Sequence, residues 1–251
     1  MSRIRSRFVF ALFVVLMATV SAASAATCTN ATLKGVYGIL ASGLNGSLLP
    51  AASVSRLAAD GAGNLTGYVM KSSDGEIFTY SSTGTYTINK NCTGIATWTN
   101  QQGQNEGANI YLNNGNKGAF VIQTDTNHVQ TGVVIEQGTV TCTNAGVKHT
   151  YSMDLTGTVI SVGQVAMAGQ LIFNGTGSIS GTATLSLYGV IYDNVSVKGT
   201  YTINSDCTGT AQITPQGLSA MNLGLLVLGT DKQMMAIEMD SNTIVAGMLQ
   251  E

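Results

Sequence analysis

The chain repeats itself, and this internal duplication constrains its fold more than any other feature. Thr27-Cys28-Thr29-Asn30 returns as Thr141-Cys142-Thr143-Asn144, and Gly84-Thr85-Tyr86-Thr87-Ile88-Asn89 returns as Gly199-Thr200-Tyr201-Thr202-Ile203-Asn204. Each copy is roughly 110 residues long, which is enough to build a separate hydrophobic core. The duplication therefore predicts two tandem domains that share one fold.

The spacing between the two copies changes once along the chain. Gly67 matches Gly181, whereas Tyr86 matches Tyr201, so the second copy has gained one residue (181 − 67 = 114, 201 − 86 = 115). A residue gained in a loop leaves strand register intact, whereas one gained inside a strand would turn the following side chains to the other face. We expect repeat 1 over residues 27–137, a linker over 138–140 and repeat 2 over 141–251.

The first 26 residues have the layout of a secretory signal peptide. Arg3, Arg5 and Arg7 precede an apolar run, Phe8–Val20, and small residues follow up to Ala26. The run is shorter than the ~20 apolar residues of a spanning helix, so we expect cleavage near Ala26 rather than a membrane anchor. The sequence predicts a secreted or periplasmic protein with no membrane span after the signal is removed.

Once the signal peptide is removed, the chain is acidic and sparsely charged. Without the three arginines, eight Lys and Arg residues stand against thirteen Asp and Glu residues, a net charge of 8 − 13 = −5. The basic residues are scattered singly and form no stripe that could follow a phosphate backbone. We therefore expect no nucleic-acid partner.

Strand and turn patterns fill both copies. Short runs rich in β-branched and aromatic residues are bounded by Gly, Asn and Asp. Tyr86 and Ile88 share one face of their segment and Thr85 and Thr87 the other, which indicates one buried and one solvated face. The first copy is expected to contain eight or nine strands, with separate strands at 77–80 and 83–88 and at most one helical turn within 47–59.

The predicted fold is all-β, with two tandem antiparallel β-barrels of about eight strands each. Two β-sandwiches are the alternative. An immunoglobulin sandwich has its cysteines in mid-strand with a Trp between them, whereas here Trp98 follows both Cys28 and Cys92, and Cys92 lies in a turn-like segment. This order favours the barrels.

Four cysteines allow three disulfide pairings. Because each copy carries its own pair, we expect Cys28–Cys92 and Cys142–Cys207. Paired cysteines are ordinary in exported proteins. A metal or redox site has less support, because the sequence contains neither CxxC spacing nor a neighbouring His.

No motif for catalysis stands out. His128 and His149 occupy non-equivalent places without an acidic or Cys neighbour, so we expect both at the surface. The sequence contains no GxSxG elbow, although a Ser-His-Asp triad is a spatial arrangement and stays open. Acidic residues recur at equivalent places, where we expect solvated strand ends: Asp125 with Asp240, and Glu136 with Glu251. We assign no catalytic residue, no metal site and no cofactor.

Three motifs together carry a resemblance to known proteins. They are Asp60-Gly61-Ala62-Gly63-Asn64-Leu65-Thr66-Gly67, the segment Gly84–Asn89 and Asn91-Cys92-Thr93-Gly94, each with a counterpart in the second copy. The pattern resembles exported, uncharacterised bacterial tandem β-domain proteins and is similar to calycin and allene-oxide-cyclase-like small barrels. The resemblance implies a barrel fold and transfers no catalytic residue.

Three classes of function follow from a secreted double barrel. The favoured one is a non-enzymatic module that binds a small apolar molecule inside a barrel, with contacts from Tyr86, Ile88, Tyr201 and Ile203. The others are an extracellular structural or surface protein and a cofactor-free, cyclase- or isomerase-like enzyme that acts by pocket shape. A continuous cavity would favour binding or catalysis, whereas interiors plugged by those four residues would favour a structural role. The oligomeric state stays open.

Overall fold

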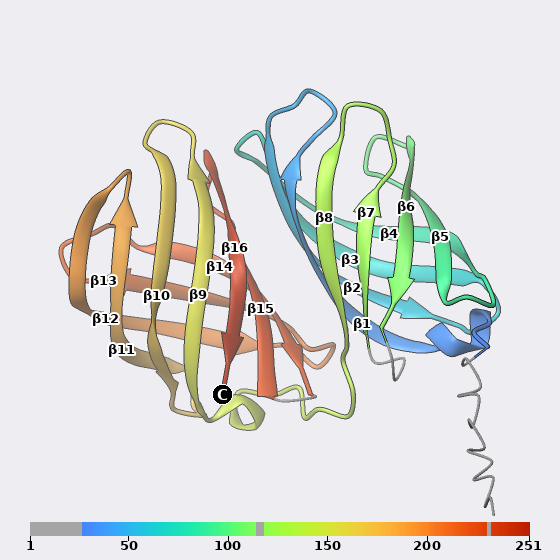
Figure 1. Cartoon of the computed structure of the whole chain (residues 1–251). Helices are drawn as coiled ribbons and strands as arrows, with labels where there is room; N and C mark the ends of the chain where they lie inside the picture. Colours follow the sequence, from blue (N-terminus) through green and yellow to red (C-terminus); the bar gives the residue numbers. More distant parts are fainter. Residues whose placement is uncertain (1–26, 114–117, 230–231) are drawn as a thin grey trace, which may run out of the picture.

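The chain forms two closed antiparallel barrels in the computed structural model, which describes residues 27–113, 118–229 and 232–251 (Figure 1). Successive strands are neighbours, and each barrel closes by pairing its first strand with its last, β1 with β8 and β9 with β16. The predicted tandem barrels are confirmed, and the sandwich alternative is wrong. The expected signal peptide, residues 1–26, lies outside the described residues.

Barrel 1 begins with a short 3₁₀ helix and continues through eight strands: η1 (Asn30–Leu33), β1 (Gly35–Leu44), β2 (Pro50–Ala59), β3 (Asn64–Ser73), β4 (Glu76–Ile88), β5 (Thr93–Thr99), β6 (Asn105–Leu112), β7 (Gly118–Gln123) and β8 (Val129–Glu136). Barrel 2 repeats this order: η2 (Ala145–Val147), β9 (Thr150–Val159), β10 (Gly163–Phe173), β11 (Ser178–Leu187), β12 (Val190–Ile203), β13 (Thr208–Pro215), β14 (Met221–Leu228), β15 (Gln233–Glu238) and β16 (Thr243–Gln250). The expected linker, residues 138–140, falls between β8 and η2.

Local structure differs from the sequence analysis in two places. Residues 77–80 and 83–88 form the single strand β4, because Ser81 and Ser82 continue the ladder by pairing with Tyr68 and Gly67 of β3. The segment 47–59, which the sequence left open to one helical turn, contains β2 instead, which pairs with β1 on one side and β3 on the other. The strand begins at Pro50, a position where the missing N–H does not interrupt a ladder.

The residue gained by the second copy lies inside a strand. Pairing of β11 with β12 shifts register between Ala183 and Leu185. At the shift, Asn194 has a φ of +50°, and its N–H donates to Thr184 Oγ1 at 3.1 Å. This β-bulge absorbs the extra residue, so the remainder of β12 keeps the face that β4 has in barrel 1.

The same closure holds one end of each barrel. Disulfides join Cys28 to Cys92 in barrel 1 and Cys142 to Cys207 in barrel 2. Asn30 of η1 accepts the Ile88 N–H on its side-chain Oδ1 at 2.7 Å, and its backbone carbonyl accepts the hydroxyl of Tyr86 at 3.0 Å. Asn144 makes the same two bonds in barrel 2, at 2.8 and 3.0 Å, to Ile203 and Tyr201. The two repeated motifs, Thr27–Asn30 and Gly84–Asn89 in barrel 1, thus bond to each other and close one end of the barrel, and their counterparts do the same in barrel 2.

A third apolar core joins the two barrels side by side (Figure 1). Its fully buried members come from β2 and β3 of barrel 1 and from β14, β15 and β16 of barrel 2: Ala52, Val54, Met70, Leu226, Leu228, Met235, Ile237, Ile244 and Ala246. Gln137 spans the contact, since its Nε2 donates to the Val227 carbonyl at 2.8 Å and its Oε1 accepts from Arg56 Nε at 3.2 Å. The barrels therefore share a buried interface.

The disulfides bear on the compartment in which the protein folds. Among the described residues no cysteine is free. Disulfides persist in oxidising compartments such as the periplasm or the extracellular space, so both bridges indicate such an environment. Across the described part of the chain, no helix has the length and apolar character needed to span a membrane.

Candidate ligand cavity in barrel 1

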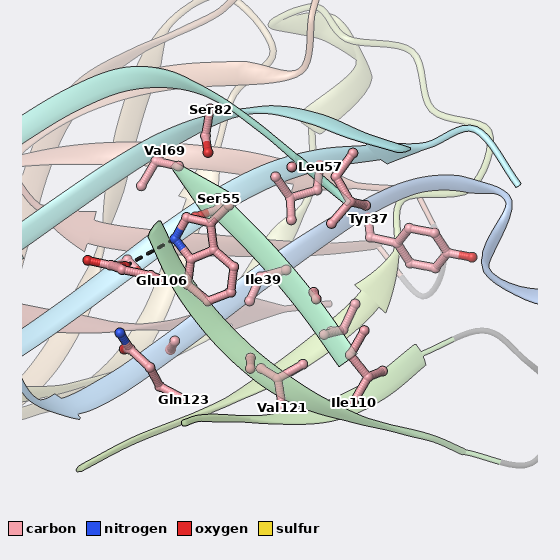
Figure 2. Close-up of a pocket in the computed structure, with 18 of the residues that line it drawn as sticks. Tyr37, Ile39, Ser55, Leu57, Val69, Ser82, Glu106, Ile110, Val121 and Gln123 are labelled. Carbon is pink, nitrogen blue, oxygen red and sulfur yellow. Dashed lines mark hydrogen bonds between the residues drawn. The ribbon is translucent and has the colours of Figure 1, made fainter. Parts of the chain in front are cut away.

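Barrel 1 encloses a cavity of about 150 Å³, lined by inward-facing residues of every strand (Figure 2). Its walls are mainly apolar and include Ile39, Leu57, Val69, Ile110 and Val121. A cavity of about 150 Å³ in another protein accommodates benzene, so this one has room for a single ring or a short chain.

Polar side chains gather at the end of the cavity away from the disulfide, where β3 and β5 end and β6 begins. Trp98 Nε1 donates to Glu106 Oε2 at 3.1 Å, the bond drawn in Figure 2, and Asn100 Nδ2 donates to Glu106 Oε1 at 2.9 Å. These two bonds fix the carboxylate in place. Lys71 lines the cavity as well, and none of the ion pairs between described residues involves it.

Two tyrosines, Tyr37 and Tyr80, are among the lining residues. Burial raises the pKa of Tyr80 to about 12, and the nearby charge of Glu106 adds to the shift. Burial is also the main cause that raises the pKa of Tyr37 to about 12, with smaller effects from Glu136 and Tyr86. Both phenols therefore stay protonated at neutral pH. In Figure 2 the hydroxyl of Tyr37 points away from the other lining residues.

The same positions in barrel 2 carry large apolar side chains. Because the registers match, the cavity pair Ala41 and Ser53 corresponds to Leu155 and Met167. Ala59 corresponds to Phe173, which is 1% exposed and lies with its ring centroid 4.7 Å from that of Tyr201. These larger side chains occupy the volume that is open in barrel 1.

The polar positions of the cavity are replaced in the same way. Trp98 pairs with Glu106 across β5 and β6, and the corresponding pair of barrel 2 is Ile213 with Met221. Lys71 of β3 corresponds to Leu185 of β11, as their matching pairs with β2 and β10 show. Barrel 2 thus lacks both the space and these polar groups.

The residues expected to contact a ligand lie elsewhere in the barrels. Tyr86 and Ile88 are 3% and 6% exposed and pack in the core of barrel 1, at the end held by the disulfide. Neither is part of the cavity lining. Tyr201 and Ile203 belong to the packed core of barrel 2. Ligand contact by these four residues stays a prediction.

Sequence reasoning missed the polar lining formed by Lys71, Trp98 and Glu106. A signal was present, since each of the three is replaced by an aliphatic residue or Met at the matching place of the second copy. Position-by-position comparison of the two copies, once the one-residue shift is placed in β12, reveals these residues.

The histidines and repeated acids have structural partners. His149 is not the unpartnered residue expected, because its Nδ1 lies 3.0 Å from Glu251 Oε1, which also pairs with Lys232 at 2.7 Å. Asp125 accepts the Gly107 N–H at 2.9 Å, and its counterpart Asp240 accepts that of Asn222 at 2.8 Å. Within the described ranges, no group of three or more His, Cys, Asp or Glu side chains could hold a metal ion.

Comparison with known proteins adds little to this geometry. No family model matches the chain, and no curated protein matches it. Among solved structures, the crystal structure of kievitone hydratase from Nectria haematococca is similar over 90% of this chain and 92% of that chain, with a TM-score of 0.32 and 8% sequence identity. At so low a TM-score the likeness supports no conclusion about fold or activity.

Proposed function

We propose that the protein is a secreted, non-enzymatic binding module whose barrel 1 holds one small, mainly apolar molecule. The observation that carries this proposal is the contrast between two barrels of matching register, one with a lined cavity and one filled by side chains. A cavity inside a barrel lowers the stability of the fold. A role in binding a ligand would explain why barrel 1 keeps one.

The lining favours a ligand with an apolar body and one polar group. Val69, Ile110 and Val121 would surround the body, and the cavity volume of about 150 Å³ limits it to a single ring or a short chain. A polar group at the other end would meet Lys71, Tyr80 and Glu106. Pockets of this composition, apolar with a few placed polar groups, are typical of small-molecule sites.

Trp98 provides the test, because it is the only tryptophan of the chain and lines the cavity. Toluene and benzyl alcohol are titrated while the intrinsic fluorescence is recorded. Both are expected to change the emission in a saturable way, and benzyl alcohol is expected to bind more tightly because its hydroxyl group can bond to the polar end. Titrations that never saturate would contradict the proposal.

Exchanging equivalent residues between the barrels gives a variant that fills the cavity and a matched control. Ser53→Met places in barrel 1 the residue that barrel 2 has at this position, and it is expected to weaken binding at least tenfold, about 1.4 kcal/mol. Met167→Ser makes the reverse change in barrel 2 and is expected to leave the Trp98 titration unchanged. Equal effects of the two variants would point to a general loss of stability instead of a filled site.

The same binding experiments distinguish this proposal from the two other classes of function. An enzyme of cyclase or isomerase type would return a chemically altered ligand, which mass spectrometry of the recovered molecule would detect. A purely structural protein would bind neither probe.

A further inference from the structure

An apolar row runs around the outside of barrel 1 across six strands. Cross-strand pairs link its members in order: Tyr111, Phe120, Val133, Leu40, Val54 and Met70. Val54 and Met70 are 0% and 5% exposed because barrel 2 covers them, and Val133 and Leu40 pack against the edge of the same inter-barrel core. The row then continues uncovered, with Phe120 61% and Tyr111 47% exposed. The exposed part is therefore continuous with an established interface.

The uncovered part corresponds to a face that is buried in barrel 2. By the matching registers of the two barrels, Tyr111 and Phe120 correspond to Leu226 and Met235, each 0% exposed. Those two residues pack against β2 and β3 of barrel 1. In barrel 2, the face equivalent to the exposed one of barrel 1 therefore forms the contact with the other barrel.

Among the described residues, the outward positions of β5 to β8 around Phe120 carry no charged side chain. Ile95 of β5 and Ile122 of β7 extend the exposed apolar area, at 56% and 47% exposure. The remaining outward positions of β5 to β8, all within the described residues, hold Thr, Asn, Gly, Val or Ile. A face without charge cannot select an oppositely charged partner, and two copies of it would meet without repulsion.

We infer that this face, defined by Ile95, Tyr111, Phe120 and Ile122, is an interface for a second copy of this chain. The two copies pack their first barrels against each other through the same residues, as in a two-fold symmetric dimer, the commonest form of homo-oligomer. The contact lies on the outer surface of β5 to β7 and does not depend on a ligand in the cavity.

Sedimentation velocity of the intact chain over a wide concentration range tests the inference. The wild type is expected to reach twice the monomer mass as concentration rises. The double variant Tyr111→Thr/Phe120→Thr is expected to weaken self-association at least 100-fold, because it removes the two aromatic residues and leaves a residue common on this face. Ile172→Thr, at an exposed apolar position of β10, is the matched control and is expected to leave the dimer intact.

A second variant keeps the test decisive if the double variant fails to fold. Asn109→Lys leaves every apolar residue in place and adds one charge beside Ile95 and Ile122, its partners across the neighbouring strands. Two such charges would face each other in the dimer, so dissociation is expected to increase at low salt. A wild type that stays monomeric at every concentration, or a dimer that survives both variants, would overturn the inference.

Discussion

The interiors of the two barrels differ although their backbones follow the same register. Barrel 1 has Ala41, Ser53 and Ala59 where barrel 2 has Leu155, Met167 and Phe173, and only the larger set fills the space. Strand number and register thus fix the volume a barrel encloses, and side-chain size decides how much of it is empty. The shared elements form a scaffold, and the differences between the copies mark where a ligand could bind.

The largest expected effect comes from emptying barrel 2. Phe173→Ala installs the residue that barrel 1 has at this position, and it should lower the free energy of unfolding by about 3 to 5 kcal/mol, because the side chain is fully buried in a packed core. Urea denaturation measures the change. A loss below about 1 kcal/mol would mean that barrel 2 is not tightly packed, and the comparison between the barrels would fail.

The next effect concerns a carboxyl group buried in barrel 2. Glu238 is 6% exposed, and burial, with a smaller effect from Asp240, raises its pKa from 4.5 to about 7. A raised pKa means that the neutral form is the one the fold favours, so its stabilising effect is complete below about pH 4.5 and is lost as pH rises through about 7. Barrel 1 has Gln123 at the matching position.

Glu238→Gln should therefore remove this pH dependence. The variant is expected to exceed the wild type in free energy of unfolding at pH 8 by up to about 3 kcal/mol, and to approach it at pH 4. Chemical denaturation at the two pH values provides the measurement. An equal difference at both would show that titration of Glu238 does not couple to folding.

The smallest effect tests what the barrels share. Tyr86→Phe and Tyr201→Phe each remove the hydroxyl that bonds to the Asn30 or Asn144 carbonyl and accepts a glycine N–H. Each should cost about 1 kcal/mol of unfolding free energy, and the two costs should be equal within error. Thermal unfolding of both variants checks this. A clear inequality would mean that the closure is not conserved between the barrels.

The sequence predicted the fold well because the duplication repeats the residues that build it. The alternation of Tyr86 and Ile88 with threonines showed which face is buried, and the paired cysteines indicated which ends of the barrel meet. The bulge at Asn194 was not predictable from spacing alone, because an inserted residue changes the offset between the copies by one whether it lies in a loop or in a bulge.

The cavity was much less accessible to sequence reasoning. Whether an interior is open depends on the summed volume of side chains from eight strands, and no single motif reports that sum. Trp98 and Glu106 lie outside the repeated motifs, four and twelve residues after Gly94 (98 − 94 = 4, 106 − 94 = 12), and only strand pairing brings them into contact across β5 and β6. The inward direction of Tyr86 was readable from the sequence, whereas its depth along the barrel, at the end held by the disulfide and outside the cavity lining, was not.

The central claim is that barrel 1 binds a ligand and barrel 2 does not. Native mass spectrometry of the protein with benzyl alcohol, which counts bound molecules per chain, tests it most directly. The account predicts one molecule per wild-type chain and none for Ala59→Phe, which carries the barrel 2 residue. Two molecules per chain, or one that the Ala59→Phe variant retains, would contradict it.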